Sequence, residues 1–222
     1  MYQLLFVALL FLTGCDEALV LGVEDANVSE KKLYESALAL DRSEDYREAA
    51  TQYENFVGLF PFSSKKSDAD LRLMKVYDHL GNYDDLDSFS EELTQGLSPT
   101  PESFYYFAKA NFRLARSEIF NMISEDVGGQ DLIRLEKAKV AYEKLLSMKN
   151  VSSDMTQKAK KEHKKVCEMI AENHFQIGQF YLNKGHEKVA KLRFQQIQTL
   201  YPNTEVAKNL AKNQRNLTKK VG

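Results

Sequence analysis

The chain has 222 residues, of which 43% are hydrophobic and 28% are charged, and it contains 4 prolines and no tryptophan. This composition is typical of an ordinary globular protein, and it excludes a disordered chain, a collagen and a multi-pass membrane protein. The 30 Lys and Arg residues nearly balance the 32 Asp and Glu residues. The resulting net charge of −2 gives no support for nucleic-acid binding, so we expect no nucleic-acid partner.

Charge is nevertheless unevenly distributed along the chain. Residues 1–131 carry 11 Lys and Arg against 24 Asp and Glu, a net charge of −13, whereas residues 132–222 carry 19 against 8, a net charge of +11. Two parts of opposite charge are suited to two different partners. The alternative is that the helices are simply solvated and that this charge distribution has no functional role.

The N-terminal segment has the features of a secretion signal. Residues 4–12 form an uninterrupted apolar run, which is too short for a bilayer span of about 20 residues but typical of a signal peptide. The run ends in Leu12-Thr13-Gly14-Cys15, and acidic residues follow at once. This motif resembles the lipobox of bacterial lipoproteins, in which the cysteine becomes the lipidated N-terminus. We therefore predict a signal peptide at residues 1–14 and a covalent lipid, such as palmitate, on Cys15.

A lipidated Cys15 would hold the protein on a membrane with its body in water, because two or more acyl chains anchor a protein stably. Residues 15–29 lack a clear period and are predicted to be the lipidated N-terminus and a tether. Asp16 marks inner-membrane retention in some enteric bacteria, so the choice between inner and outer membrane stays open at this point. The remaining thiol, Cys167, has helical apolar neighbours and is predicted to be a small buried residue.

From residue 30 onward the pattern is helical, and we predict an all-α fold. Two stretches match the offsets of a tetratricopeptide unit of about 34 residues. The first runs from Ala37 to Pro61 and the second, which fits better, runs from Gly178 to Pro202. Weaker units lie between them, which gives about five helix pairs that should stack into a superhelix.

The predicted solenoid covers residues 30–222. It has N-terminal repeats at about 30–116, an exposed insertion at 117–132 and C-terminal repeats at 133–210. The lysine-rich stretch 158–165 is predicted to cover the solvated side of a long helix.

The order of these features resembles one family. A lipobox and a short tether precede the segment Tyr46 to Ser63, the link Pro99-Thr100-Pro101 and the segment Tyr181 to Thr204. This order is similar to that of the BamD (YfiO-like) lipoproteins of the bacterial β-barrel assembly machinery, over about residues 29–210.

The resemblance implies an outer-membrane lipoprotein on the periplasmic face, acting as a scaffold in outer-membrane protein assembly. Its implied partners are a BamA-type β-barrel subunit, other subunits of the machinery and unfolded outer-membrane proteins. The family is described as receiving substrate signals on its N-terminal repeats and BamA on its C-terminal repeats. Other tetratricopeptide lipoproteins, such as a secretin pilotin or a cell-wall coordination factor, are the main alternative.

Repeat offsets also give a candidate substrate groove, because the first helix of each tetratricopeptide pair lines the concave face. An aromatic and apolar strip bordered by lysines would hold the C-terminal end of an outer-membrane protein, with its carboxylate beside a lysine. The alternative is that the apolar members are core residues. The candidates are Lys31, Tyr34, Leu71, Lys75, Tyr105, Lys109 and Phe112.

We find no pattern typical of catalysis. The four histidines form neither a His-Glu-x-x-His motif nor a cysteine–histidine ligand cluster, so no metal site is predicted. Phosphate loops, dinucleotide-binding glycines and nucleophile elbows are also missing from the sequence. We therefore expect a protein that is not an enzyme and has no cofactor apart from the lipid on Cys15. An envelope hydrolase with appended repeats is the alternative from another class.

Overall fold

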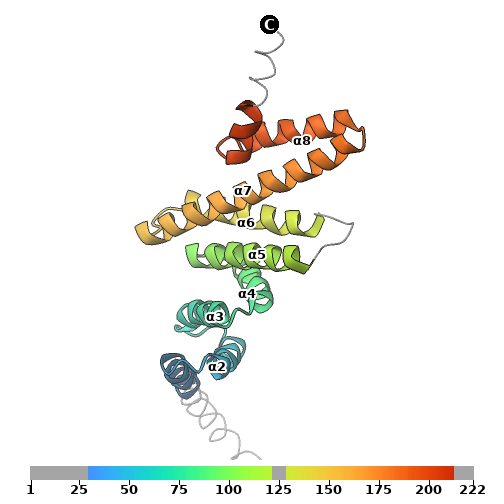
Figure 1. Cartoon of the computed structure of the whole chain (residues 1–222). Coiled ribbons are helices and arrows are strands. Elements are labelled where there is room, and N and C mark those ends of the chain that lie inside the picture. Colours follow the sequence, from blue (N-terminus) through green and yellow to red (C-terminus); the bar gives the residue numbers. More distant parts are fainter. Residues whose placement is uncertain (1–29, 122–128, 213–222) are drawn as a thin grey trace, which may run out of the picture. The chain divides into compact units, whose positions relative to one another are not determined.

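The computed structural model describes residues 30–121 and 129–212, and every regular element within these ranges is a helix (Figure 1). The predicted all-α repeat fold is therefore confirmed. The predicted signal peptide, Cys15 and the tether lie outside the described residues.

The chain divides into two compact units, Met1–Leu80 and Gly81–Gly222. The described part of the first unit contains a helix at residues 30–42, α2 (Tyr46–Leu59) and α3 (Lys66–Leu80). The described part of the second unit contains α4 (Tyr83–Gln95), α5 (Pro101–Asn121), α6 (Gly129–Ser147), α7 (Ser153–Asn183), α8 (Glu187–Leu200) and a helix at residues 205–212. The predicted N-terminal repeats, residues 30–116, are therefore shared between the two units.

The prolines end or begin helices as their chemistry requires. Pro61 and Pro202 follow the last residues of α2 and α8 by two positions, where a missing N–H and a fixed φ stop a helix. Pro101 is the first residue of α5, where its missing N–H costs nothing. The Thr100 hydroxyl accepts a hydrogen bond from the backbone N–H of Ser103 at 3.1 Å and so caps that helix.

The core of the first unit is built from the predicted repeat positions. Ala37 and Ala49 are fully buried and allow helix 30–42 and α2 to approach closely, while Tyr53 and Phe56 fill the space beside them. Because small and aromatic residues alternate at helical spacing, each helix presents one apolar side to its neighbour.

In the second unit, helices that follow each other in the chain pack side by side: α4 on α5, α5 on α6, α6 on α7 and α7 on α8 (Figure 1). A continuous core runs through this stack and includes Leu135, Tyr142 and Ile170. Gly178 of α7 is a point of close approach, because a methyl group there would lie 2.5 Å from a ring carbon of Phe194 of α8. Gly178 and Phe194 both lie in the predicted repeat from Gly178 to Pro202.

The predicted insertion at residues 117–132 overlaps two helices. α5 continues to Asn121 and α6 begins at Gly129, and residues 122–128 lie outside the described ranges. A long helix does carry the lysine-rich stretch: α7 has 31 residues, and all five lysines of residues 158–165 are exposed. The Ser152 hydroxyl caps α7 by accepting from the backbone N–H of Met155 at 3.2 Å.

Candidate functional site

The seven predicted groove residues are divided between the two units. Lys31, Tyr34, Leu71 and Lys75 belong to the first unit, and Tyr105, Lys109 and Phe112 belong to the second. Each group is therefore considered within its own unit.

Tyr34 is part of the core of the first unit, with only 7% of its surface exposed. Its ring lies 5.3 Å from the ring of Phe56, and its hydroxyl donates a hydrogen bond to the carboxylate of Asp68 in α3. The ammonium group of Lys65 covers the ring at 4.3 Å. Tyr34 is thus a structural link between helix 30–42 and α3, which corrects its assignment to an open groove.

That link continues as a network of charged groups. Arg72 of α3 donates to Asp68 at 2.7 Å and to Asp41 at 3.2 Å, and Asp41 accepts a bond from the Tyr53 hydroxyl at 3.3 Å. Burial alone would raise the pKa of Asp68, but the hydrogen bonds from Tyr34 and Arg72 outweigh it and hold the pKa below its usual range. The network therefore ties helix 30–42, α2 and α3 together electrostatically.

The other candidates of the first unit lie at its surface. Lys31 is exposed and pairs with Glu35 on its own helix at 3.8 Å. Leu71 is half-buried, whereas Lys75 is exposed on α3 near enough to Asp68 to lower that carboxyl's pKa. Lys75 is accordingly the predicted cation that remains available to a ligand carboxylate in this unit.

In the second unit, Tyr105 and Lys109 are half-buried on α5 and both take part in further interactions. The ring of Tyr105 lies edge-on to Tyr142 of α6 at 6.2 Å. Phe112 is only 2% exposed and belongs to the core cluster, so the assignment of Phe112 to a groove is corrected. A groove residue and a core residue at helical spacing look alike in the sequence.

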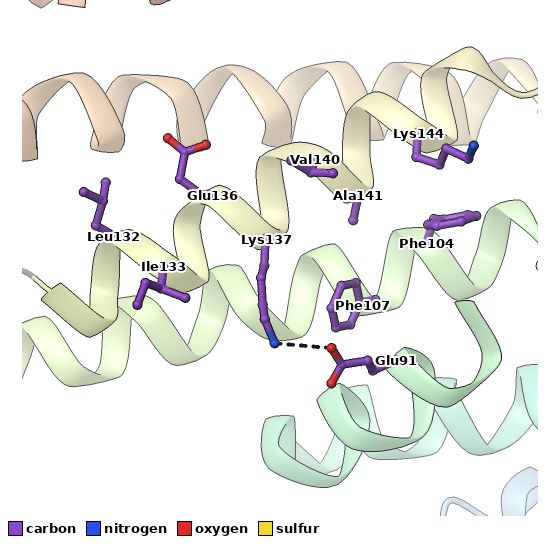
Figure 2. A pocket seen from close by; sticks show the side chains of 10 residues that line it. All are labelled: Glu91, Phe104, Phe107, Leu132, Ile133, Glu136, Lys137, Val140, Ala141 and Lys144. Carbon is purple, nitrogen blue, oxygen red and sulfur yellow. Dashed lines mark hydrogen bonds and ion pairs between the residues drawn. The ribbon is translucent and has the colours of Figure 1, made fainter. Parts of the chain in front are cut away.

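The structure instead shows an open apolar pocket of about 730 Å³ between α4, α5 and α6 (Figure 2). Phe104 and Phe107 of α5 and Leu132, Ile133, Val140 and Ala141 of α6 provide its apolar surface. Ile133 is 62% exposed and Val140 is 58% exposed, and both belong to the apolar lining of the same pocket.

The charged residues around this pocket differ in whether they have a partner of opposite charge. Lys137 reaches across to Glu91 of α4 at 3.3 Å, while Glu136, which also lines the pocket, extends from α6 away from α5 (Figure 2). Glu136 accepts a hydrogen bond from the Tyr201 hydroxyl at 2.5 Å. Lys144 is exposed, and no carboxylate of the described residues forms an ion pair with it.

Sequence reasoning missed this pocket for an identifiable reason. Leu132 lies in the predicted insertion, and periodicity in this part of the chain predicts only the core side of a helix. The signal was present: Ile133 and Val140 are seven residues apart, so they share a helical face that excludes the buried Leu135 and Tyr142.

The C-terminal helices also carry exposed apolar side chains. Five large ones are 38–61% exposed, and basic residues accompany them. The apolar members are Phe180, Leu182, Val189, Leu192 and Leu200. The basic members are Lys184, Lys188 and Lys191, all exposed. We call these eight residues the α7–α8 surface.

Neither catalytic nor metal chemistry is indicated by the described residues. They contain no group of three or more His, Cys, Asp and Glu side chains that could hold a metal ion. Burial raises the pKa of the Cys167 thiol to about 11, so the thiol stays protonated and weakly nucleophilic at neutral pH. No helix of the described ranges is both long and apolar enough to cross a bilayer.

Comparison with known proteins identifies the family. A model of the YfiO family, described as outer membrane lipoprotein, matches residues 26–220. A search of curated proteins finds no match. The match covers nearly all of the chain and includes both units. The chain therefore belongs to the YfiO family of BamD-like outer-membrane lipoproteins.

Proposed function

We propose that this protein is a lipid-anchored, non-enzymatic scaffold of the β-barrel assembly machinery on the periplasmic face of the outer membrane. The family match over residues 26–220 carries the proposal, because it joins an outer-membrane lipoprotein family to a chain with a lipobox and helical repeats. Lipid on Cys15 would supply the anchor. The helical units would supply surfaces for a BamA-type subunit and for unfolded outer-membrane proteins.

The α7–α8 surface is the candidate contact for the BamA-type subunit. Exposed apolar side chains rimmed by polar ones are typical of protein interfaces, and the three lysines of this surface outnumber Glu187, the exposed carboxylate among them. Val189, Leu192 and Leu200 lie at spacings of three and eight along α8, which places them on one side of that helix. An acidic partner with an apolar centre fits this surface.

The anchor and the partner can be tested together. The native lipoprotein is purified from detergent-solubilised envelopes, and the co-purifying proteins are identified by mass spectrometry. A BamA-type barrel in near-equal amount supports the proposal. A secretin or cell-wall enzymes in its place would replace it with the pilotin or cell-wall alternative.

A matched pair of variants locates the contact. Leu192→Asp places a charge on the α7–α8 surface, and Leu97→Asp places one on a still more exposed leucine of the turn between α4 and α5. We expect the first to lose the BamA-type subunit and the second to retain it. Equal recovery from both variants would remove α8 from the contact.

The substrate role rests on Lys75 in the first unit. A positioned cation stabilises a peptide's terminal carboxylate, and Lys75 is exposed on α3. We expect Lys75→Glu to weaken binding of a peptide from the C-terminus of an outer-membrane protein, whereas Lys32→Glu on helix 30–42 serves as the control. Unchanged affinity of Lys75→Glu would remove this residue from the proposal.

A further inference from the structure

The pocket between α4, α5 and α6 is distinct from the surfaces used above, and its residues belong to one compact unit. Its most exposed members lie on α6 at positions 133, 137, 140 and 144, separated by four, three and four residues. Such spacing forms one straight stripe on a helix, about 16 Å long at 1.5 Å per residue. The stripe alternates an aliphatic residue with a lysine.

The two aliphatic residues of this stripe are not part of the core of the described unit. The core side of α6 carries Leu135, Ala138 and Tyr142, which are at most 1% exposed. Ile133 and Val140 lie on the other side and are more than half exposed. α6 is therefore apolar on two sides, and only one of them is covered by its own unit.

Phe104 and Phe107 extend the apolar surface from the stripe onto α5, as Figure 2 shows. Both rings are half-buried. A volume of about 730 Å³ accommodates several aliphatic side chains rather than one. The size and the length of the stripe match a segment of two to three helical turns.

Charge decides what kind of segment fits. Lys137 is already neutralised by Glu91, whereas Lys144 at the other end of the stripe pairs with no carboxylate of the described residues. An occupant therefore gains by placing a carboxylate next to Lys144.

A second copy of this chain does not provide that carboxylate. If two α6 stripes met about a two-fold axis, Lys144 of one would face Ile133 of the other, and Lys137 would face Val140. Each lysine would then lose water without gaining a partner of opposite charge. An acyl chain likewise offers nothing to Lys144.

We propose that the pocket between α4, α5 and α6 binds an acidic amphipathic helix of a partner protein. The aliphatic side chains of that helix pack on Ile133, Val140 and Phe107, and a carboxylate pairs with Lys144. Amphipathic helices bind in grooves in this way, through apolar side chains spaced three or four residues apart. The inference is independent of the contacts with a BamA-type subunit or an unfolded substrate.

The test uses the purified full chain and two labelled probes. One is an amphipathic peptide of about 18 residues made of Leu, Ala and Glu, and the other has Lys in place of every Glu. Binding is measured by fluorescence anisotropy at low and at high salt. We expect the Glu peptide to bind at least about tenfold more tightly than the Lys peptide at low salt, with a smaller difference at high salt.

Two variants then locate the site. Val140→Asp should weaken binding of the Glu peptide at least about tenfold, because it buries a charge under the peptide. Lys144→Glu should weaken it about fivefold at low salt, and the control Lys149→Glu should leave it within about twofold of wild type. Circular dichroism checks that each variant keeps the wild-type helix content.

Several outcomes would overturn the proposal. One is equal binding of the two peptides, and another is equal affinity of Lys144→Glu and Lys149→Glu for the Glu peptide. A third is a concentration-dependent dimer that Val140→Asp abolishes while neither peptide binds, which would assign the pocket to a second copy. Each result leaves the co-purification of a BamA-type subunit unaffected, so the two proposals fail separately.

Discussion

The two units differ at one helix contact each, which is polar in the first unit and apolar in the second. In the first, a chain of polar contacts through Asp68, Arg72 and Asp41 joins all three described helices. In the second, an apolar contact joins α7 and α8, where Gly178 lies against the ring of Phe194. The stability of the first unit should therefore depend on salt and on acid, and the stability of the second should depend on side-chain volume.

The largest expected effect comes from the core of the second unit. Ile170 is fully buried on α7, and Ile170→Ala should cost about 2–5 kcal/mol through lost burial and a residual cavity. Hydrogen exchange followed by mass spectrometry should show lost protection in residues 81–212 but not in residues 30–80, and salt should not change the result. Equal loss of protection in both ranges would show that the units unfold as one.

The next effect tests the close contact directly. Gly178→Val should destabilise the second unit by about 1–3 kcal/mol because the added carbons overlap the Phe194 ring. Thermal unfolding followed by circular dichroism measures the loss, and Phe194→Leu in the same chain should recover part of it. Gly58→Val is the matched control, since a side chain there meets nothing within 4 Å. A similar loss at both positions would mean that helix propensity, and not the overlap, is responsible.

A smaller effect is expected from the polar network. Arg72→Met removes the cation between Asp41 and Asp68 and should cost about 1–2 kcal/mol, because these groups are partly exposed and screened by solvent. The cost should shrink in about 1 M salt, where the screening length is about 3 Å. Hydrogen exchange of residues 30–80 reports it, with the exposed Arg47→Met as control. A cost that salt does not alter would assign the role of Arg72 to packing.

The smallest effect is a difference between the two units in how their stability depends on pH. His174 of α7 is buried, and its pKa is lowered first by burial and then by Arg193, despite the opposing charge of Glu136. A histidine that is neutral in the fold contributes stability above its unfolded pKa of about 6.5, and this stability is lost as pH falls through the lower folded pKa. We therefore expect the melting temperature to fall between about pH 7 and pH 5, and His174→Gln to reduce that fall.

The first unit should respond at lower pH. Asp68 has a lowered pKa, so its contribution is present above the unfolded value of about 4 and is lost as pH falls below it. Hydrogen exchange corrected for pH should show residues 81–212 loosening first and residues 30–80 later. The reverse order would contradict both assignments.

Much of the fold follows from the sequence because its signals are local. Ala37, Tyr53 and Gly178 lie in the two predicted repeats and are packed against neighbouring helices, and Pro61 and Pro202 follow helix ends at the predicted ends of these repeats. These residues act through side-chain size or backbone geometry. Both are properties of the residue itself and do not depend on distant parts of the chain.

The candidate site was less predictable because exposure depends on neighbours. Tyr34 and Phe112 have the spacing of groove residues but are buried, while Ile133 and Val140 have the spacing of core residues but are exposed. Periodicity identifies which residues share a face, and only packing decides whether that face is covered. The hydrogen bond from Tyr34 to Asp68 joins positions 34 residues apart, and no local pattern indicates it.

The unbroken length of α7 has a mechanical consequence. Its 31 residues span about 46 Å, and it packs against α6 and against α8. A continuous hydrogen-bonded helix resists bending. A displacement of α8 is therefore transmitted along α7 with little deformation of α7 itself. A partner that binds and displaces α8 therefore also displaces α6, the helix that carries Val140 and Lys144.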